Sequence, residues 1–276
     1  MLRAEVAVSP GLVLANRRPL VFVAGVNVLE EGETCLEVAA VLKACATRLG
    51  VGLVFKASFD KANRSSAQSW RGPGMIAGLA MLRRVGDETG LPLMTDIHTA
   101  AQAAPVAEVV DVLQIPAFLC RQTDLLDAAI QTGRPLHIKK MQTMSPRDAL
   151  QVVAKCADLG AQQVILCERG TSFGYQNLVV DPLGVAELAA GPVPLCVDVT
   201  HAVQLPGALD GRAGGRRDLV LPLALSMAAL GVAAVFFECH PNPDLARCDG
   251  PSALDLPGAV RLMERVVAVD RLVKAL

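Results

Sequence analysis

Residues 20–59 read LVFVAGVNVLEEGETCLEVAAVLKACATRLGVGLVFKASF, which places a strand pattern, a helix pattern and a second strand pattern in succession. The runs LVFVAG (20–25) and GLVFKASF (52–59) are short and apolar, as expected for strands buried on both faces. The amphipathic stretch between them (33–50) ends in Gly50, a plausible helix C-cap. Two apolar runs joined by a helix pattern are typical of a βα unit on a parallel sheet.

The same alternation continues along the chain. Between the apolar runs lie amphipathic stretches such as residues 145–160, in which Ser145 is the predicted N-cap and Pro146 the first helical residue. Eight such units predict one α/β domain over residues 1–276, a closed (β/α)8 TIM barrel. Residues 6–18 are expected to form a short β-hairpin that caps the bottom of the barrel. The six further strand runs are residues 91–97, 111–117, 136–141, 163–169, 194–200 and 233–239.

Composition excludes several classes of protein. Hydrophobic residues make up 52% of the chain and the mean hydropathy is +0.41, but charges interrupt every apolar run before the ~18 residues of a membrane span. No apolar segment follows a basic start, so we expect no secretion signal and a cytoplasmic location. A net charge of −1 gives no basic surface for nucleic acid. The eight cysteines contain no CxxC pair and are expected to be reduced core thiols.

Polar residues occur near the end of almost every predicted strand. Because the carboxyl ends of parallel barrel strands meet at one mouth, these side chains should converge there. Several cations in one mouth repel one another unless anions neutralise them, which favours a polyanionic ligand such as a phosphorylated substrate. The cations are Lys56, Lys61, Arg64, Lys139 and Arg169; the other strand-end groups are Asn27, Asp96, His98, Gln114, Lys140, Asp198, His201, Glu238 and His240.

The segment FKASFDKANRSS (55–66) is the densest group of hydrogen-bond donors in the sequence. It follows a buried strand directly, so an anion site is a better interpretation than a solvated charged loop. Its donors are Lys56, Ser58, Lys61, Asn63, Arg64 and Ser65.

His201, Glu238 and Asp249 follow the seventh and eighth strands. One imidazole and two carboxylates can form a metal site, an acid–base relay or a buried structural network, and spacing does not choose between these. His98 and His240 are interpreted as structural residues, and His137, in the middle of a strand, as a packing residue.

Six motifs together resemble the 3-deoxy-D-manno-octulosonate 8-phosphate synthases, also called 2-dehydro-3-deoxyphosphooctonate aldolases. The resemblance runs from about residue 20 to the C-terminal region. It implies condensation of phosphoenolpyruvate with D-arabinose 5-phosphate and water, which gives 3-deoxy-D-manno-octulosonate 8-phosphate and phosphate for lipopolysaccharide synthesis. The motifs are FKASFDKANRSS, IPAFLCRQTDLL, ERGTSFGYQNLVVD, DVTHAVQ, the glycine pair of AGGRR, and HPNPDLARCDGPSAL.

The resemblance also implies roles for individual residues. Arg121 should reach the sugar phosphate from a neighbouring subunit, which implies a homo-oligomer, typically a tetramer. His201, Lys61 and a bound water are candidates for moving protons, and Asn27, Glu238 and Asp249 complete the expected catalytic group. Phosphoenolpyruvate should be held by Lys56, Ser58, Lys61, Gln114, Lys139 and Arg169 with the backbone near Ala117, and arabinose 5-phosphate by Asn63, Arg64 and Ser65, with Asp96 also in the substrate-binding set.

Asn27 bears on whether a metal is needed. The family has a metal-requiring branch with cysteine at this position and a metal-free branch with asparagine, and an amide is a much weaker ligand than a thiolate. We therefore expect no essential metal and no cofactor. His201, Glu238 and Asp249 remain available as ligands, so a metal-dependent form of the same enzyme is the alternative.

Two rival functions stay open at this point. One is the related synthase that condenses phosphoenolpyruvate with erythrose 4-phosphate, and the other is a catalytically silent phosphosugar-binding barrel. The chain departs from the family pattern at Met141, Thr143, Met144 and Asn242, all near the mouth. Residues 205–217, long for a βα loop and rich in glycine, are the best candidate for a lid.

Overall fold

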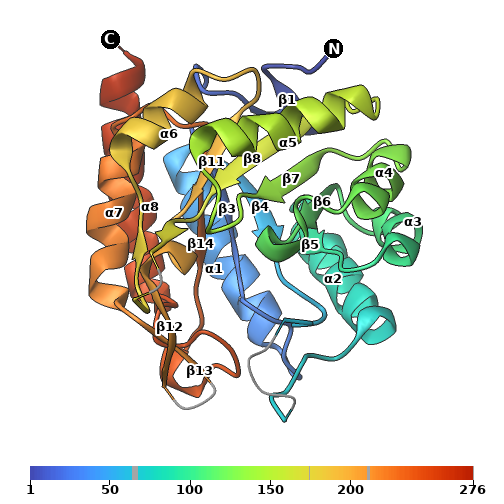
Figure 1. The fold of residues 1–276 in the computed structure, drawn as a ribbon. Helices are drawn as coiled ribbons and strands as arrows, with labels where there is room; N and C mark the ends of the chain where they lie inside the picture. Colours follow the sequence, from blue (N-terminus) through green and yellow to red (C-terminus); the bar gives the residue numbers. More distant parts are fainter. Residues whose placement is uncertain (64–67, 174, 210–211, 276) are drawn as a thin grey trace.

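Eight parallel strands close into a barrel in the computed structural model of the chain, which describes residues 1–63, 68–173, 175–209 and 212–275 (Figure 1). The order around the barrel is β11–β14–β3–β4–β5–β6–β7–β8. The TIM barrel predicted from the sequence is thereby confirmed. The strands are β3 (Val21–Gly25), β4 (Gly52–Lys56), β5 (Leu93–Asp96), β6 (Val112–Ile115), β7 (Leu136–Lys139), β8 (Val164–Glu168), β11 (Leu195–Asp198) and β14 (Ala234–Glu238).

Each predicted strand run contains one observed strand, and each observed strand is shorter than its run. The largest difference at one end is at β4, which ends at Lys56 although the apolar run continues to Phe59. There the chain leaves the ladder and Ser58 keeps only an isolated bridge to Val28. The apolar pattern continues because the loop after the strand is itself buried.

Helices surround the barrel (Figure 1). Gly50 ends α1 in the left-handed conformation with φ 67°, as its C-cap assignment predicted. Ser145 accepts a hydrogen bond from the backbone N–H of Asp148, and Pro146 begins α5, so that N-terminus is also confirmed. The helices are α1 (Thr34–Leu49), α2 (Met75–Thr89), α3 (Ala103–Ala107), α4 (Thr123–Gln131), α5 (Pro146–Asp158), α6 (Pro182–Ala189), α7 (Val220–Ala228) and α8 (Leu256–Lys274), with 3-10 turns at Ala100–Gln102, Ala117–Leu119, His201–Val203, Arg217–Leu219 and Pro243–Leu245.

An N-terminal hairpin closes the bottom of the barrel, as predicted. It consists of β1 (Val6–Ser9) and β2 (Leu12–Leu14). Val6 and Leu14 are completely buried and belong to the same apolar cluster as Val112 inside the barrel. Leu12 also packs against Gly52 at the start of β4, where a Cβ would lie 2.2 Å from the leucine Cδ1.

The barrel interior is apolar at the bottom and charged at the mouth. Inward-facing positions alternate along each strand. On β14 these are Ala234, Phe236 and Glu238, of which the first two belong to the apolar interior cluster and the third is a buried carboxylate. A larger apolar cluster fills the layer between strands and helices. The charged groups are therefore concentrated at the carboxyl end.

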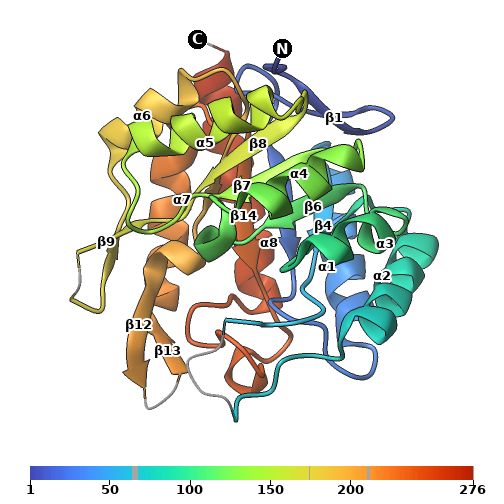
Figure 2. The ribbon, with the colours of Figure 1, turned by 45° about the vertical axis from the view of Figure 1, so that its right-hand side comes forward.

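Two small hairpins rise from that end of the barrel, away from both termini (Figure 1). One pairs β9 (Thr171–Ser172) with β10 (Leu178–Val179), and the other pairs β12 (Gln204–Leu209) with β13 (Arg212–Gly215). Figure 2 shows β9 beside β12, and Gln176 Nε2 donates a hydrogen bond to the carbonyl of Gly207 at 3.3 Å. The predicted lid segment 205–217 thus contains most of the second hairpin.

All eight cysteines lie among the described residues and are buried, reduced thiols. This agrees with the expectation from the sequence. None of the helices in the described part of the chain combines the length and apolar character needed to cross a bilayer.

Candidate active site

The polar residues predicted at the strand ends come together at the carboxyl end of the barrel. Most are almost completely buried, which is unusual for charged side chains unless they are paired. The buried set comprises Asn27, Lys56, Ser58, Asp96, Gln114, Lys139, Arg169, Asp198 and Glu238, none of them more than 6% exposed.

Lys56 and Asp96 lie at the centre of one half of this group. Lys56 Nζ donates to Ser58 Oγ at 2.8 Å and lies 3.6 Å from Asp96 Oδ1 and 3.8 Å from Glu238 Oε1. The Ser58 hydroxyl donates to Asp96, whose other oxygen is 3.0 Å from His98 Nε2. Burial and then repulsion by Lys61 lower the pKa of Lys56. Burial alone would raise the pKa of Asp96, but Lys56 and His98 hold it well below its ordinary value.

Gly25 allows the two strands beside Lys56 to approach closely. A Cβ at Gly25 would lie 2.1 Å from the carbonyl oxygen of Lys56, which is backbone and cannot move aside. The end of β3 therefore has to be glycine for Asn27 to follow at the mouth next to Lys56.

The other half of the group is built around Asp198. Its Oδ1 accepts hydrogen bonds from the backbone N–H of Thr200 and His201, at 3.1 and 2.9 Å. Its Oδ2 accepts from Lys139 Nζ and lies 2.7 Å from His201 Nδ1. Burial opposes ionisation, yet His201 and Lys139 hold the pKa of Asp198 well below its ordinary value. Lys139 also lies over the Phe236 ring, 3.4 Å from its centroid.

Asn27 and His201 connect these two halves. Asn27 Nδ2 donates to Glu238 Oε2 at 2.5 Å and to Asp249 Oδ2 at 2.9 Å. His201 Nε2 is 3.8 Å from each of the same two oxygens. Asn27 Oδ1 is buried and has no hydrogen-bond partner among the described residues. A water or a substrate oxygen that donates a hydrogen bond would satisfy it.

His201, Glu238 and Asp249 are close enough to hold a metal ion, since one ligand atom of each lies within 4.8 Å of the others. The group does not fit a strongly bound ion as it stands. The Asn27 amide nitrogen already donates to Glu238 Oε2 and Asp249 Oδ2, so both carboxylates have a hydrogen-bond donor. An amide N–H is a donor and cannot be a ligand.

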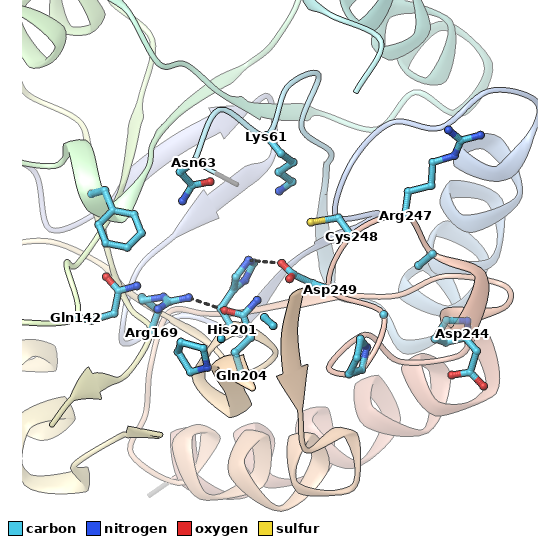
Figure 3. Close-up of a pocket in the computed structure, with 18 residues that line it drawn as sticks. Lys61, Asn63, Gln142, Arg169, His201, Gln204, Asp244, Arg247, Cys248 and Asp249 are labelled. Carbon is cyan, nitrogen blue, oxygen red and sulfur yellow. Dashed lines mark hydrogen bonds and ion pairs between the residues drawn. The ribbon is translucent and has the colours of Figure 1, made fainter. Parts of the chain in front are cut away.

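A cavity of about 440 Å³ opens above this network (Figure 3). Lys61 and Asn63 face it from the loop after β4, and Arg169 and His201 face it from the opposite side, with Asp249 beside His201. These five predicted residues line the cavity directly. The wall also includes residues that were not given a site role from the sequence, namely Gln142, Gln204, Arg247, Cys248 and Phe118. Pro206, Gly207 and Ala213 of the predicted lid segment complete it.

Lys61 and Arg169 are the cations best placed to bind an anion. Neither the Lys61 ammonium nor the Arg169 guanidinium has a carboxylate oxygen within 4.0 Å in the part of the chain that the structure describes. Arg169 donates to Gln204 Oε1 at 3.1 Å. Although burial alone would lower it, the pKa of Lys61 is raised, chiefly by Glu238 and Asp96, so Lys61 remains an ammonium.

The expectation that every cation in the mouth needs a ligand anion was too strong. Lys56 has Asp96 and Glu238 as partners, and Lys139 has Asp198. These carboxylates come from other strands, so the sequence spacing did not reveal the pairing. The charge that a ligand must neutralise is therefore carried mainly by Lys61 and Arg169.

Several predicted residues do not line the cavity. Lys56, Ser58, Asp96, Gln114 and Lys139 lie in the barrel wall. Arg121 is exposed at the end of the Ala117–Leu119 turn and Ala117 is partly exposed, while Phe118 between them reaches the cavity. Arg64 and Ser65 lie outside the described residues.

Lys140 is held away from the cavity. Its Nζ donates to the Met144 carbonyl at 3.0 Å and to Thr171 Oγ1 at 3.1 Å, and lies 3.5 Å from Glu168. Met144, one of the departures from the family pattern, is therefore part of the buried support of this loop.

Arg247 was missed by sequence reasoning. Its guanidinium lies 4.7 Å from the centre of the Trp70 ring, and its backbone N–H donates to Glu30 at 3.0 Å. Trp70 belongs to the loop that carries Lys61 and Asn63, and Arg247 to the loop that carries Asp249. The contact thus ties together the loops on either side of the cavity. The only sequence signal was the presence of the single tryptophan soon after the donor-rich segment.

Known proteins are similar to this chain along almost its whole length. The model of the DAHP synthetase I family matches residues 5–275. A 2-dehydro-3-deoxyphosphooctonate aldolase of Marinobacter nauticus is 51% identical over 275 residues, which cover 100% of this chain and 98% of the relative. Proteins with the same name from Prochlorococcus marinus (50% identity, 95% and 93% covered) and Magnetococcus marinus (51%, 94% and 90%) are similar along almost their whole length.

Proposed function

Since the chain belongs to the DAHP synthetase I family, and within it to the 2-dehydro-3-deoxyphosphooctonate aldolases, we propose that its barrel mouth condenses phosphoenolpyruvate with D-arabinose 5-phosphate without an essential metal. The enzyme is a 3-deoxy-8-phosphooctulonate synthase. The products are 3-deoxy-D-manno-octulosonate 8-phosphate and inorganic phosphate.

The observation that carries the proposal is a pair of cations at one cavity, Lys61 and Arg169, whose charged groups have no carboxylate partner among the described residues. They reach it from different loops, with His201 and Asp249 between them (Figure 3). One anionic substrate would contact both, and its carboxylate or phosphate would replace the missing counter-ion. Arginine can hold two oxygens of such a group at once. Lys56 and Lys139, just beneath, add positive potential without needing to touch the ligand.

The reaction forms one carbon–carbon bond. C3 of phosphoenolpyruvate attacks the aldehyde carbon of arabinose 5-phosphate, and the aldehyde oxygen takes a proton to become a hydroxyl. Water adds to C2 and loses a proton. The C2 hydroxyl then gives up its proton and becomes the ketone as the bond from C2 to the bridging oxygen breaks, and phosphate leaves with that oxygen and that proton. Negative charge develops at the aldehyde oxygen and must be stabilised by a cation or a proton donor.

His201 and Lys61 are suited to that stabilisation. Asp198 lies beside Nδ1 of His201 and fixes the ring, so Nε2 is the nitrogen directed at Glu238, Asp249 and the cavity. A proton can pass between Nε2 and a water or substrate oxygen. Lys61, kept as an ammonium by the surrounding carboxylates, can donate to the oxygen that gains charge. Glu238 and Asp249 can accept the proton that the attacking water loses.

Asn27 supports the metal-free form of the reaction. Its amide nitrogen bridges the two carboxylates that would otherwise need a cation, and its buried oxygen is left to orient a water or the aldehyde. The metal-dependent form of the enzyme remains the alternative, because His201, Glu238 and Asp249 are all ligand types.

The assembly also belongs to this proposal. We propose a homo-oligomer, a tetramer by resemblance, in which Arg121 of one subunit reaches the sugar phosphate of the next. Arg121 is exposed and outside the cavity of its own chain. Phe118 beside it is 58% exposed although it lines the cavity, so this turn has apolar surface that a neighbour can cover. Arg64 and Ser65 keep their predicted sugar-phosphate role, and the cytoplasmic location stays a prediction.

The test is phosphate release from phosphoenolpyruvate with each of two aldoses in parallel. We expect turnover with arabinose 5-phosphate and little with erythrose 4-phosphate. The opposite preference would favour the related synthase, and no turnover with either would favour a silent binding barrel. Arg169→Ala should lose most activity, whereas Arg84→Ala, which removes an exposed ion pair with Glu33, is the matched control and should keep it.

A further inference from the structure

A second group of metal-ligand side chains lies inside the barrel, separate from the mouth. His137, Cys167 and Cys196 each present a ligand atom within 4.8 Å of the other two. All three residues are 0% exposed. They come from the neighbouring strands β7, β8 and β11, and β8 pairs with both of the others.

The group lies one layer below the active site. His137 precedes Lys139 by two residues on β7, and Cys196 precedes Asp198 by two on β11, so each member of the Lys139–Asp198 ion pair has one of these side chains beneath it on the same face. Cys167 stands in the same relation to Arg169. Lys139, Arg169 and Asp198 therefore lie directly above this layer of side chains.

Packing does not explain why the two ring nitrogens of His137 are buried. Neither ring nitrogen has a hydrogen-bond partner among the described residues. The ring stacks against Phe236, with centroids 6.1 Å apart and planes 26° apart, but stacking leaves both nitrogens unsatisfied. A buried imidazole without partners is costly and rare, since nearly all buried polar groups are hydrogen-bonded.

The nearest suitable chemistry is the thiol pair. Cys167 Sγ makes a weak contact of 3.6 Å with the Glu168 carbonyl. Two thiolates and a neutral imidazole are ligands that suit thiophilic divalent ions such as Zn²⁺. Loss of the two thiol protons on binding would balance the charge of a divalent ion.

We propose that His137, Cys167 and Cys196 form an interior binding site for a thiophilic divalent ion, with Zn²⁺ as its probe. The bound ion would join three adjacent strands through one atom and satisfy one nitrogen of His137. It would be structural, not catalytic, so it is independent of the proposal that the mouth reaction needs no metal. The competing interpretation is that His137 is only a packing residue.

Burial determines how the ion would enter and leave. None of the three ligands is exposed, so the ion would bind as the chain folds and exchange slowly afterwards. A chelator added to the folded protein should therefore leave it in place. Unfolding in the presence of chelator should release it.

The test is to unfold the full chain with chelator, refold it with either Zn²⁺ or Co²⁺, and remove unbound ion. We expect retention of about one Zn²⁺ per chain and, with Co²⁺, the near-ultraviolet charge-transfer absorption that thiolate ligands give. Cys196→Ala should abolish both signals. Cys156→Ala should keep both, because it removes an equally buried thiol on the outer helix α5.

Asp249→Ala distinguishes this site from the mouth. It should not change the thiolate absorption, since Asp249 belongs to the other ligand group. Parent protein that refolds without binding Zn²⁺ or showing the absorption would overturn the proposal, whatever the variants do. Equal signals in Cys196→Ala and parent would also overturn it. Each of these readouts is independent of catalysis, so a failure here is distinct from a failure of the condensation assay.

Discussion

Asn27 Nδ2 lies 2.5 Å from Glu238 Oε2, and it donates this hydrogen bond from just beyond the end of β3, the first barrel strand, to the end of β14, the last strand and its neighbour in the closed barrel. The same nitrogen donates to Asp249 at 2.9 Å. A neutral amide therefore contacts both carboxylates of the candidate metal-ligand group. We propose that the identity of this one side chain decides whether the mouth binds a metal ion.

Replacing this amide by a thiol should create a metal site. In Asn27→Cys a thiolate would join His201, Glu238 and Asp249, giving four ligands suited to a transition metal. We expect a gain of about one ion per chain over the parent protein, measured by elemental analysis after exposure to Mn²⁺ or Zn²⁺. Asn27→Ala is the control, because it removes the amide without supplying a ligand. Equal metal content in the two variants would contradict the proposed site.

The buried Lys139–Asp198 pair should make the free energy of unfolding fall at acidic pH. Burial alone would raise the pKa of Asp198 above its ordinary value of 3.8. The folded-state pKa nevertheless lies well below that value, because His201 and Lys139 stabilise the carboxylate. Its contribution is therefore complete above about pH 5 and is lost as the pH falls toward the folded pKa. Asp198→Asn should lose about 3–5 kcal/mol of unfolding free energy at neutral pH, since Lys139 is left buried without its partner.

Urea unfolding at a series of pH values measures both effects. Between about pH 5 and pH 2 the parent should lose more stability than Asp198→Asn, which lacks the titrating group. Asp87→Asn, an exposed site on α2, should follow the parent curve. Parallel curves for parent and Asp198→Asn would show that the pair does not contribute in this way.

Loss of the contact between Trp70 and Arg247 should change the KM for arabinose 5-phosphate more than the KM for phosphoenolpyruvate. It connects the loop of Lys61 and Asn63 to the loop of Asp249, and Trp70 itself is outside the cavity lining. A partly exposed cation–π contact is worth about 0.5–1 kcal/mol, so Trp70→Leu should raise the KM for arabinose 5-phosphate about two- to fivefold.

Steady-state kinetics with each substrate varied in turn will check this. Trp70→Phe keeps an aromatic face for Arg247 and should have the smaller effect. If Trp70→Leu changes both KM values equally, or neither, the two loops are not positioned through this contact.

The barrel could be predicted because its signals are local. Alternating apolar runs and amphipathic stretches identified all eight strands, and Gly50 and Ser145 marked helix ends by their own backbone chemistry. The strand ends were less accurate, as at β4, because the buried loop after Lys56 is as apolar as the strand.

The site was harder to predict because its partners are distant in sequence. The sequence showed which residues would gather at the mouth, but not that Asp198 would neutralise Lys139 from 59 residues away or that Lys140 would be held by the next loop. His137 was interpreted as a packing residue because it lies in the middle of a strand, and the sequence did not show that the thiols of Cys167 and Cys196 on other strands lie beside it. Such pairings depend on strand register, which the pattern of apolar residues does not report.

The central claim is that this mouth condenses the two phosphorylated substrates without a catalytic metal. The most direct test is phosphate release from phosphoenolpyruvate and arabinose 5-phosphate by folded protein dialysed against a strong chelator, compared with untreated protein and with protein given Mn²⁺ afterwards. We expect the same turnover in all three samples. A large loss after chelation that Mn²⁺ restores would contradict it.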